Sequence, residues 1–421
     1  MRKAWAPLTL VVLLCLALAG LPAPAVGQQP RIGITVSAWF IPPANDLLKE
    51  IVAEWARQKG VVAEVEFVSE GDLVPKFTTA AEAGAGPDII QVASLHAHLY
   101  ADKLVDVTDI VGPLESKYGP IAEIARDAAM VRGRWRAVPW YATPQVLTYR
   151  EDLLREIGEP VPDTWEDALR VGRKLKAKGV PWGEALGHCP VDCVTTVYSI
   201  LWAHGAREVE KDGKTIALKS PETVKALEFI KRAYDEAWPP GVVGWDNASN
   251  NRAFLGSQLG LTTNAATIWF AARRQAPGIF PSINHAPIPR GPAGRAIPFW
   301  PTSLAVFQHS KNAALARDLV RYITDGPQFL RWLEKTEGAG GSALLGITKL
   351  EKGRDPKLKT VPEVIQYGRL PGWPGPPTRE SAEVHAKFVL VDMAQNVVKG
   401  MPIPQAIDQA LAEMKRIYGQ R

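Results

Sequence analysis

The sequence predicts an α/β protein with a parallel, doubly wound sheet and more than one hydrophobic core. The first observation is that strand-like and helix-like patterns alternate over residues 31–92. Parallel strands joined by helices need right-handed crossovers, so this alternation is typical of a parallel sheet covered by helices. The second observation is length, because the about 390 residues after the N-terminal leader exceed one ordinary core. Two lobes or domains are therefore expected.

The first five elements follow from the spacing of apolar residues. Leu47, Ile51 and Trp55 recur at helical spacing, whereas the stretches on either side alternate as strands do. The Gly-Ala-Gly-Pro segment at 84–87 ends the second helix. The expected elements are a strand at 31–39, a helix at 44–60, a strand at 61–68, a helix at 72–83 and a strand at 88–92.

A second α/β section is expected after Pro144. Thr164 is a good helix N-cap because Glu166 and Asp167 follow in the first turn, where acidic residues are favoured. Proline- and glycine-rich connections at 277–301 and 368–377 are expected to be loops that border a cleft. The other expected elements are strands at 145–149 and 259–263 and helices at 221–234, 313–323 and 404–418.

The N-terminus has the pattern of a secretion signal. Positive charge at Arg2 and Lys3 precedes the apolar run 8–18, and small residues suit cleavage near Gly27. The apolar run is short for a membrane span, and Leu14 before the cysteine of that run does not suit a lipid-attachment box. We expect residues 1–27 to be cleaved and the protein to be exported, periplasmic or at the cell surface, and soluble.

Charge and motifs argue against several classes of function. The formal net charge is only +5 and no basic stripe occurs, so no nucleic-acid partner is expected. No G-x-G-x-x-G fingerprint follows a strand, and no cofactor is predicted. Cys189 and Cys193 would meet oxidising conditions after export, which favours a disulfide. A metal site with His188 and Asp192 is the disfavoured alternative, since the spacing is too crowded for zinc.

Polar and aromatic residues follow the first three predicted strands. Ligands of doubly wound sheets bind beyond the carboxyl ends of strands. Trp39, Glu70, Ser94 and His96 occupy these ends and are predicted ligand contacts. Asp72 is the alternative at the second end, although N-capping of the next helix is its expected role. His98 and Asp102 would complete a metal site with His96, but a cleft-edge His96 and a surface His98 are preferred.

Five places in the chain, spread over nearly all of it after the leader, carry characteristic segments. They are DLVPKF (72–77) with GPDII (86–90), AVPWY (137–141) with LTYREDLL (147–154), PDTWEDA (162–168), AFLGS (253–257) with LTTN (261–264), and SKNAA (310–314). In these segments and in their order the chain resembles the bacterial extracellular solute-binding proteins of family 1, the sugar-type binding components of ABC importers.

The resemblance implies a two-lobed periplasmic-binding-protein fold of type II, like that of maltose-binding protein, with crossing strands at the hinge. It implies one lobe at 31–141 plus 259–303 and another at 142–258 plus 304–421. Val92 and Leu95 stand where maltodextrin-binding members carry Trp and Asp, and Trp269 comes two positions late. The resemblance therefore implies no particular sugar.

Further candidate ligand contacts lie at strand ends and loops that would face the cleft. Aromatic rings cover the apolar faces of sugars, and polar side chains bind the hydroxyl groups. Ser342 resembles part of the family's ligand loop in the second lobe, and Asp246, Asn247 and Asn250 form a polar cluster or a turn. The remaining predicted contacts are Tyr141, His188, Asp192, Trp245, Asn264, Trp269 and Trp300.

These observations favour reversible capture of a carbohydrate or polyol by a monomer that delivers it to the transmembrane subunits of an ABC permease. One alternative keeps the fold but binds a phosphorylated solute such as a glycerophosphodiester, for which Arg150, Arg252 and Arg273 are available. A secreted glycoside hydrolase is a distant alternative, because it needs two carboxyl groups about 5–10 Å apart. No carboxylate pair here has a recognisable catalytic setting, so no enzyme activity is expected.

Overall fold

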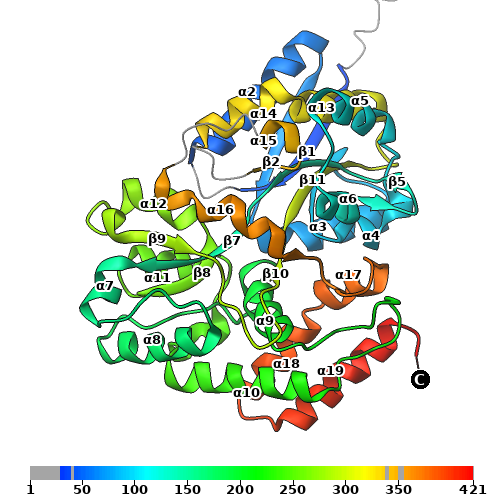
Figure 1. The fold of residues 1–421 in the computed structure, drawn as a ribbon. Coiled ribbons are helices and arrows are strands. Elements are labelled where there is room, and N and C mark those ends of the chain that lie inside the picture. The colour runs from blue at the N-terminus through cyan, green and yellow to red at the C-terminus, as the bar shows by residue number, and fades with distance from the viewer. Residues whose placement is uncertain (1–28, 39–41, 337–340, 349–354, 421) are drawn as a thin grey trace, which may run out of the picture.

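The computed structural model describes residues 29–38, 42–336, 341–348 and 355–420. The predicted signal peptide and Trp39 lie outside these residues. Two large hydrophobic cores divide the molecule into an upper first lobe and a lower second lobe (Figure 1). Among the described residues, no helix is long and apolar enough to cross a membrane.

The first lobe contains a six-stranded sheet in the order β12-β6-β11-β3-β1-β2. β1 pairs in parallel with β2 and β3, as the alternating pattern predicts. β11 is antiparallel to both β3 and β6, so the sheet is mixed rather than wholly parallel. The strands are β1 (Arg31–Ser37), β2 (Val62–Val68), β3 (Ile89–Ala93), β6 (Val138–Ala142), β11 (Pro301–Val306) and β12 (Gly341–Ser342), and a separate hairpin pairs β4 (Met130–Val131) with β5 (Arg134–Trp135).

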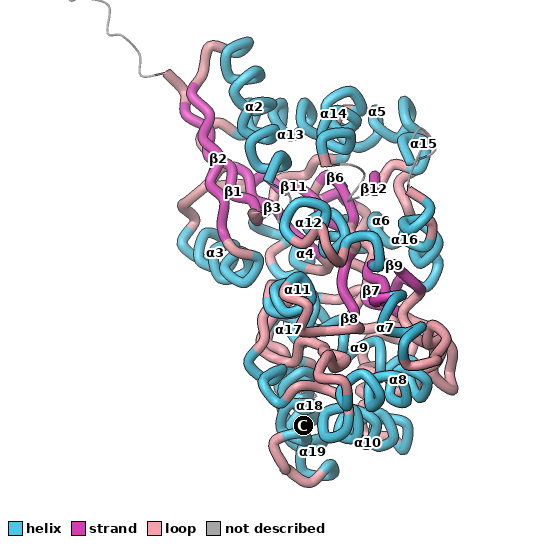
Figure 2. The backbone as a smooth tube through the Cα atoms, turned by 90° about the vertical axis from the view of Figure 1, so that its left-hand side faces the viewer, coloured by secondary structure: helices cyan, strands magenta, loops and turns pink. Residues whose placement is uncertain are grey.

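Helices cover both faces of this sheet (Figures 1 and 2). One group lies away from the second lobe and contains α2 (Pro42–Lys59), α5 (Thr108–Tyr118), α13 (Ala313–Thr324), α14 (Gly326–Lys335) and α15 (Leu345–Thr348). The other lies toward the second lobe and contains α3 (Glu70–Ala83), α4 (His96–Leu99), η1 (Ala101–Lys103) and α6 (Glu123–Ala129).

The start of α3 differs from the prediction in a way that affects the site. Asp72 was expected to cap this helix, but Ser69 is the N-cap, and its side chain accepts a hydrogen bond from the backbone N–H of Asp72. The helix therefore begins at Glu70, two residues earlier than predicted. Gly84 ends it in the left-handed conformation, which glycine adopts without steric cost.

The second lobe is mostly helical around a three-stranded antiparallel sheet in the order β8-β7-β9. Its strands are β7 (Gln145–Arg150), β8 (Leu261–Ala265) and β9 (Ile283–Ala286), with a second small ladder of β10 (Ile297–Pro298) and β13 (Gly368–Arg369). Its helices are α7 (Glu151–Glu156), α8 (Trp165–Ala177), α9 (Asp192–Ala203), α10 (Pro221–Glu236), α11 (Ser249–Leu255), α12 (Thr267–Gln275), α16 (Thr360–Glu363), α17 (Arg379–Ala386), α18 (Val389–Val398) and α19 (Ile403–Ile417). Short 3-10 turns are η2 (Pro240–Gly244), η3 (Phe280–Ser282), η4 (Pro356–Leu358) and η5 (Val364–Tyr367).

The predicted lobe boundaries are wrong for two segments. Residues 259–300 were assigned to the first lobe, but β8 and β9 pair with β7 in the second. The segment 304–344 was assigned to the second lobe, but β11 inserts between β3 and β6, and its neighbours pack in the first core. The chain therefore crosses between the cores near 143–144 and near 300–301, and a third time between Leu344 of the first core and Leu358 of the second.

Candidate ligand-binding site between the two lobes

A cavity of about 100 Å³, the main cleft, lies between the two lobes. Its first-lobe lining comes from the ends of strands and from the start of α3. These residues are Ser37, Ala38, Glu70, Ala93, Tyr141 and Thr302. The second-lobe and crossing residues are Thr143, Gln145, Val191, Asp192, Asn247, Asn251, Asn264, Ala265, Thr267 and Trp300. Both lobes and both crossings near 143 and 300 thus contribute to one site.

Glu70 is the acidic side chain that the first lobe contributes to the main cleft. It is the first residue of α3, directly after the Ser69 cap, and this position brings it beside the end of β1. Burial raises the pKa of its carboxyl group, and a hydrogen bond with the Ser37 side chain opposes that rise.

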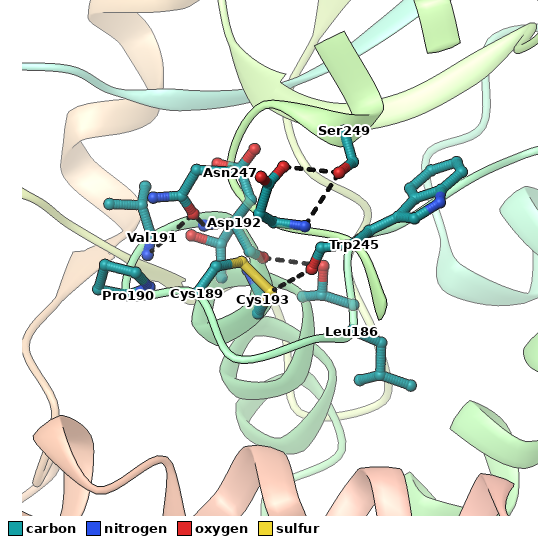
Figure 3. The surroundings of a disulfide bond; sticks show 12 residues. Leu186, Cys189, Pro190, Val191, Asp192, Cys193, Trp245, Asn247 and Ser249 are labelled. Carbon is teal, nitrogen blue, oxygen red and sulfur yellow. Dashed lines mark hydrogen bonds between the residues drawn. A yellow bond between two sulfur atoms is a disulfide. The ribbon is translucent and has the colours of Figure 1, made fainter. Parts of the chain in front are cut away.

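Asp192 is the acidic side chain that the second lobe contributes, at the start of α9 (Figure 3). Its carboxylate Oδ2 accepts a hydrogen bond of 2.9 Å from Asn264 Nδ2, and its backbone N–H donates to Asn247 Oδ1 at 3.0 Å. Burial raises its pKa well above the usual range, a hydrogen bond from Asn250 opposes this, and repulsion by Glu184 and Glu70 adds to it. The two lobes therefore place like charges within electrostatic reach of each other.

A disulfide encloses Asp192 and shapes this part of the cleft. Cys189 and Cys193 are joined, with their Cα atoms 5.2 Å apart, and enclose the turn that carries Asp192 (Figure 3). Asn247 reaches across to this turn, because its Oδ1 also accepts from the backbone N–H of Val191 at 3.4 Å. The polar cluster after Trp245 therefore supports the acidic turn as well as forming a turn of its own.

Two aromatic rings contribute to the apolar part of the lining. Tyr141 stacks on Trp332 of the first core, with ring centroids 5.1 Å apart. Trp300 is fixed by a 3.0 Å hydrogen bond from its Nε1 to Thr195 Oγ1 and by stacking on His385 at 5.3 Å. These contacts hold both rings in place before any ligand is bound.

Five of the residues predicted from the sequence line the main cleft, namely Glu70, Tyr141, Asp192, Asn264 and Trp300. Six others do not, and Trp39 lies outside the described residues. Trp269 is only 1 % exposed and packs in the second core against Phe270 and Phe280, so it is no ligand platform.

Trp245 and Ser342 also have other surroundings. Trp245 is half-buried against the second core, and its carbonyl accepts a hydrogen bond from Gly187 N–H beneath the disulfide. Ser342 pairs with Tyr141 in the sheet, and its Oγ accepts from the backbone N–H of Leu344 at 3.0 Å. Ser94 is buried with φ 48° and its backbone N–H bonds to the Pro301 carbonyl, but it is not part of the lining.

The predicted contacts His96 and His188 belong to a second cavity of about 470 Å³, the histidine cavity, between α3, α4 and α17. His96 of the first lobe stacks on His385 of the second, with ring centroids 5.9 Å apart. His188 stacks on Phe388 and bonds to Asp392. Burial lowers the pKa of His96 to about 3 and that of His385 to about 4, and His385 further lowers that of His96.

Sequence reasoning missed Gln145, Asn251, Thr267 and Thr302 in the main cleft and His385 beside it. A signal existed for Gln145, because it is the polar first residue of a strand directly after the crossing near 143. Thr302 is brought in by the pairing of β11 with β3, Asn251 and Thr267 lie on α11 and α12, and His385 lies on α17. No local pattern specifies those contacts. Among the described residues, no group of three His, Cys, Asp or Glu side chains could hold a metal ion.

The fold has many relatives among solved structures. A tagatose-bound ABC-transporter solute-binding protein of Thermotoga lettingae is 18 % identical, with a TM-score of 0.82 over 92 % of this chain and 100 % of that chain. A maltose-bound protein of T. maritima is 22 % identical, with a TM-score of 0.78 over 92 % and 99 %. A laminaribiose-bound sugar transporter of Arthrobacter chlorophenolicus is 18 % identical, with a TM-score of 0.81 over the same shares. These likenesses show a maltose-binding-protein-like fold.

Sequence comparison gives the family. A probable ABC transporter-binding protein of Deinococcus radiodurans is 25 % identical over 353 residues, which are 80 % of this chain and 81 % of that protein. The model of the bacterial extracellular solute-binding proteins matches residues 42–325, about two thirds of the chain and segments of both lobes. The chain therefore belongs to the bacterial extracellular solute-binding protein family.

Proposed function

We propose that the protein is the substrate-binding component of an ABC importer and reversibly captures a carbohydrate or polyol in the main cleft. The observation that supports this best is the lining, in which Tyr141 and Trp300 accompany carboxylate, amide and hydroxyl side chains from both lobes. Aromatic rings cover the C–H faces of a sugar, and the polar groups bind its hydroxyl rim. The sugars bound by structural relatives agree with this class of ligand.

Capture follows from the position of the cleft between two separately packed cores. A ligand that contacts both lobes stabilises the closed arrangement by its differential affinity, and the crossings near 143 and 300 act as hinge segments. The closed form then presents the solute to the transmembrane subunits of its permease. In this proposal the mature protein is exported and acts in the periplasm or at the cell surface.

A phosphorylated ligand is less well supported. The three arginines considered for it are engaged away from the main cleft: Arg150 with Asp152, Arg252 with Asp246, and Arg273 over the Trp269 ring. Among the described lining residues there is no lysine or arginine to neutralise the negative charge of a phosphate group.

A thermal-shift screen of the purified protein against monosaccharides, oligosaccharides, polyols and sugar phosphates tests this function. A ligand at about 100 times its dissociation constant stabilises the native state by about 2.7 kcal/mol, which raises the melting temperature measurably. The bound ligand should be recovered chemically unchanged. A screen in which every carbohydrate and polyol leaves the melting temperature unchanged contradicts the proposal, and a converted ligand indicates catalysis instead.

A further inference from the structure

We propose that the ligand of the main cleft carries a protonated amine, as in an amino sugar or an aminopolyol, held between Glu70 of the first lobe and Asp192 of the second. This inference rests on the proposed function and names the chemical class of the solute more narrowly. It follows from the charges, the hydrogen-bond donors and the rings that surround the cavity.

The charged side chains among the described lining residues of the main cleft are all acidic. Glu70 and Asp192 face the same cavity from opposite lobes, and neither forms an ion pair with a described residue. No arginine or lysine occurs among the described lining residues. Elsewhere the chain pairs even exposed carboxylates, such as Asp163 with Arg290 and Arg295. Closure brings two like charges together in a desolvated space, which is costly unless a cation enters with the ligand.

The described lining of the main cleft contains hydrogen-bond acceptors that lack donors, which favours a ligand with several donors. Gln145 lines the cleft, is only 3 % exposed, and its Oε1 is buried without a hydrogen-bond partner. Each carboxylate has lone pairs beyond the one used by Ser37 or by Asn264. An ammonium group supplies three N–H donors from one small centre, so it can satisfy acceptors from both lobes together. A neutral hydroxyl group supplies one donor.

The aromatic lining suits the same group. Tyr141 and Trp300 present fixed rings to the cavity, and a cation near such a ring is attracted by its negative face. A metal ion is the other cation that two carboxylates attract. The described residues, however, place no third carboxylate, histidine or cysteine with this pair.

Proton release provides a signature of this mode of binding. Burial raises the pKa of both carboxyl groups, because it penalises the charged form. An incoming ammonium group stabilises the carboxylate forms and lowers these pKa values, so its binding releases protons at any pH where the carboxyl groups of the empty cleft are partly protonated. A neutral sugar has no such effect, because it adds no charge.

The test is isothermal titration of the purified protein, with chelator present, in two buffers of different ionisation enthalpy. The probes are hexosamines and aminopolyols, their neutral parents, their N-acetyl derivatives, and the polyamine spermidine. We expect an amine to bind about 10- to 100-fold more tightly than its neutral and N-acetyl counterparts, as a hydrogen-bonded charge pair implies. We also expect its binding to release protons.

Asp192→Asn and Glu70→Gln should each remove most of that preference, because the amides retain the shape and one acceptor but not the charge. Asp192→Asn should also reduce the proton release. Asp163→Asn is the matched control: this carboxylate of the second lobe pairs with Arg290 and Arg295 and does not line the cleft, so the preference should stay. Glu70→Gln lies in the other lobe and keeps the test decisive if the Asp192 variant folds poorly.

The outcomes separate the two proposals. Neutral or N-acetylated sugars that bind as tightly as the amines overturn the amine inference and leave the carbohydrate function standing. Spermidine binding with no carbohydrate binding overturns the carbohydrate function and leaves the cationic site standing. A complete absence of binding across the panel overturns both.

Discussion

The main cleft and the histidine cavity are neighbours between the same two lobes, yet their chemistry is opposite. Glu70 lines the main cleft, and the next residue, Gly71, lines the histidine cavity. Likewise, Val191 lines the main cleft and its neighbour Pro190 lines the histidine cavity. The main cleft contains acidic and amide side chains that lack basic partners among its described lining. The histidine cavity contains imidazoles together with Arg379 and Lys387. Trp300 and His385, stacked on each other, form the wall between them.

We therefore assign different roles to the two cavities of this interface. In the proposed function, occupancy of the main cleft favours closure, because the cleft presents groups that a ligand can satisfy. Beside it, His96 Nε2 and His385 Nδ1 are buried without partners, and the rings touch only because the lobes meet. Opening the lobes returns these nitrogens to water, so the histidine cavity sets how easily closure occurs.

Removing the wall between the cavities should have the largest effect. Trp300→Ala deletes a fixed aromatic surface of the main cleft and the stacking partner of His385, so we expect binding to weaken about 100-fold. Because Trp300 is buried, the native state should also lose about 3–5 kcal/mol. Titration and urea unfolding measure the two effects. Trp300→Phe retains a ring and should recover most of the affinity, and equal affinity of the Ala variant would show that the ligand binds elsewhere.

Acid should weaken ligand binding through the histidine cavity. The closed arrangement holds His96 and His385 neutral, with pKa values of about 3 and about 4 instead of 6.5. A histidine whose pKa is lowered contributes its full stability above pH 6.5 and loses it as the pH falls toward the lowered value. If opening exposes the ring, each histidine weakens closure about tenfold at pH 5.5.

Charged and titratable side chains face this pair from several elements. Arg379 and Glu383 of α17, Lys387 at the C-terminal end of that helix and His188 of the disulfide turn line the cavity. The backbone carbonyl of Asp127 on α6 is hydrogen-bonded to His98 on α4. Replacing His385 by Phe should reduce the pH dependence of ligand affinity between pH 6.5 and 5, measured by titration. His309→Gln, in a distant part of the first lobe, should leave that pH dependence unchanged. If ligand affinity of the His385 variant varied with pH as it does in the wild type, the histidine cavity would not contribute to the closure equilibrium.

The disulfide turn connects both cavities, so its loss should have an intermediate effect. Replacing Cys189 and Cys193 together by Ser removes a short loop closure, which the chain-entropy model values at about 2 kcal/mol. We expect lower stability in thermal unfolding and a modest loss of affinity, because Asn247 still bonds to the turn. A loss of affinity as large as that of Trp300→Ala would mean that the disulfide itself forms the site.

Trp269→Phe should have the smallest effect on binding. Its ring packs in the second core and under Arg273, so we expect a destabilisation of about 1–3 kcal/mol and unchanged affinity. The comparison with Trp300 separates a tryptophan of the core from one of the cleft. Weakened binding without weakened stability would restore Trp269 as a ligand contact.

These two tryptophans also show how far sequence alone could predict the molecule. The alternation over 31–92 correctly predicts β1 to β3 with α2 and α3, because local periodicity determines those elements. Helix α9 was missed, although Asp192, Thr195, Thr196 and Ser199 recur at helical spacing. All its residues are buried, so this polar stripe faces the protein interior and not the solvent. The lobe boundaries failed because β11 and β9 join sheets whose other strands lie far away in the sequence.

The same limit applies to the site. Glu70, Tyr141 and Trp300 end strands or begin the segments that follow them, and that position is visible in the sequence. Trp245 and Trp269 have similar local surroundings and pack in the core instead. Whether such a side chain points into the cleft or packs in the core depends on tertiary packing. The stacking of His96 on His385 across the lobes illustrates this dependence.

The most direct test of the main cleft as the ligand site is a crystal structure of the protein with the solute that titration identifies. We predict density for the ligand between the two lobes, in contact with Trp300 and within hydrogen-bond distance of both Glu70 and Asp192. The His96 and His385 rings should remain stacked beside it. A ligand in the histidine cavity, or one bound to a single lobe without contact to Asp192, would contradict this account.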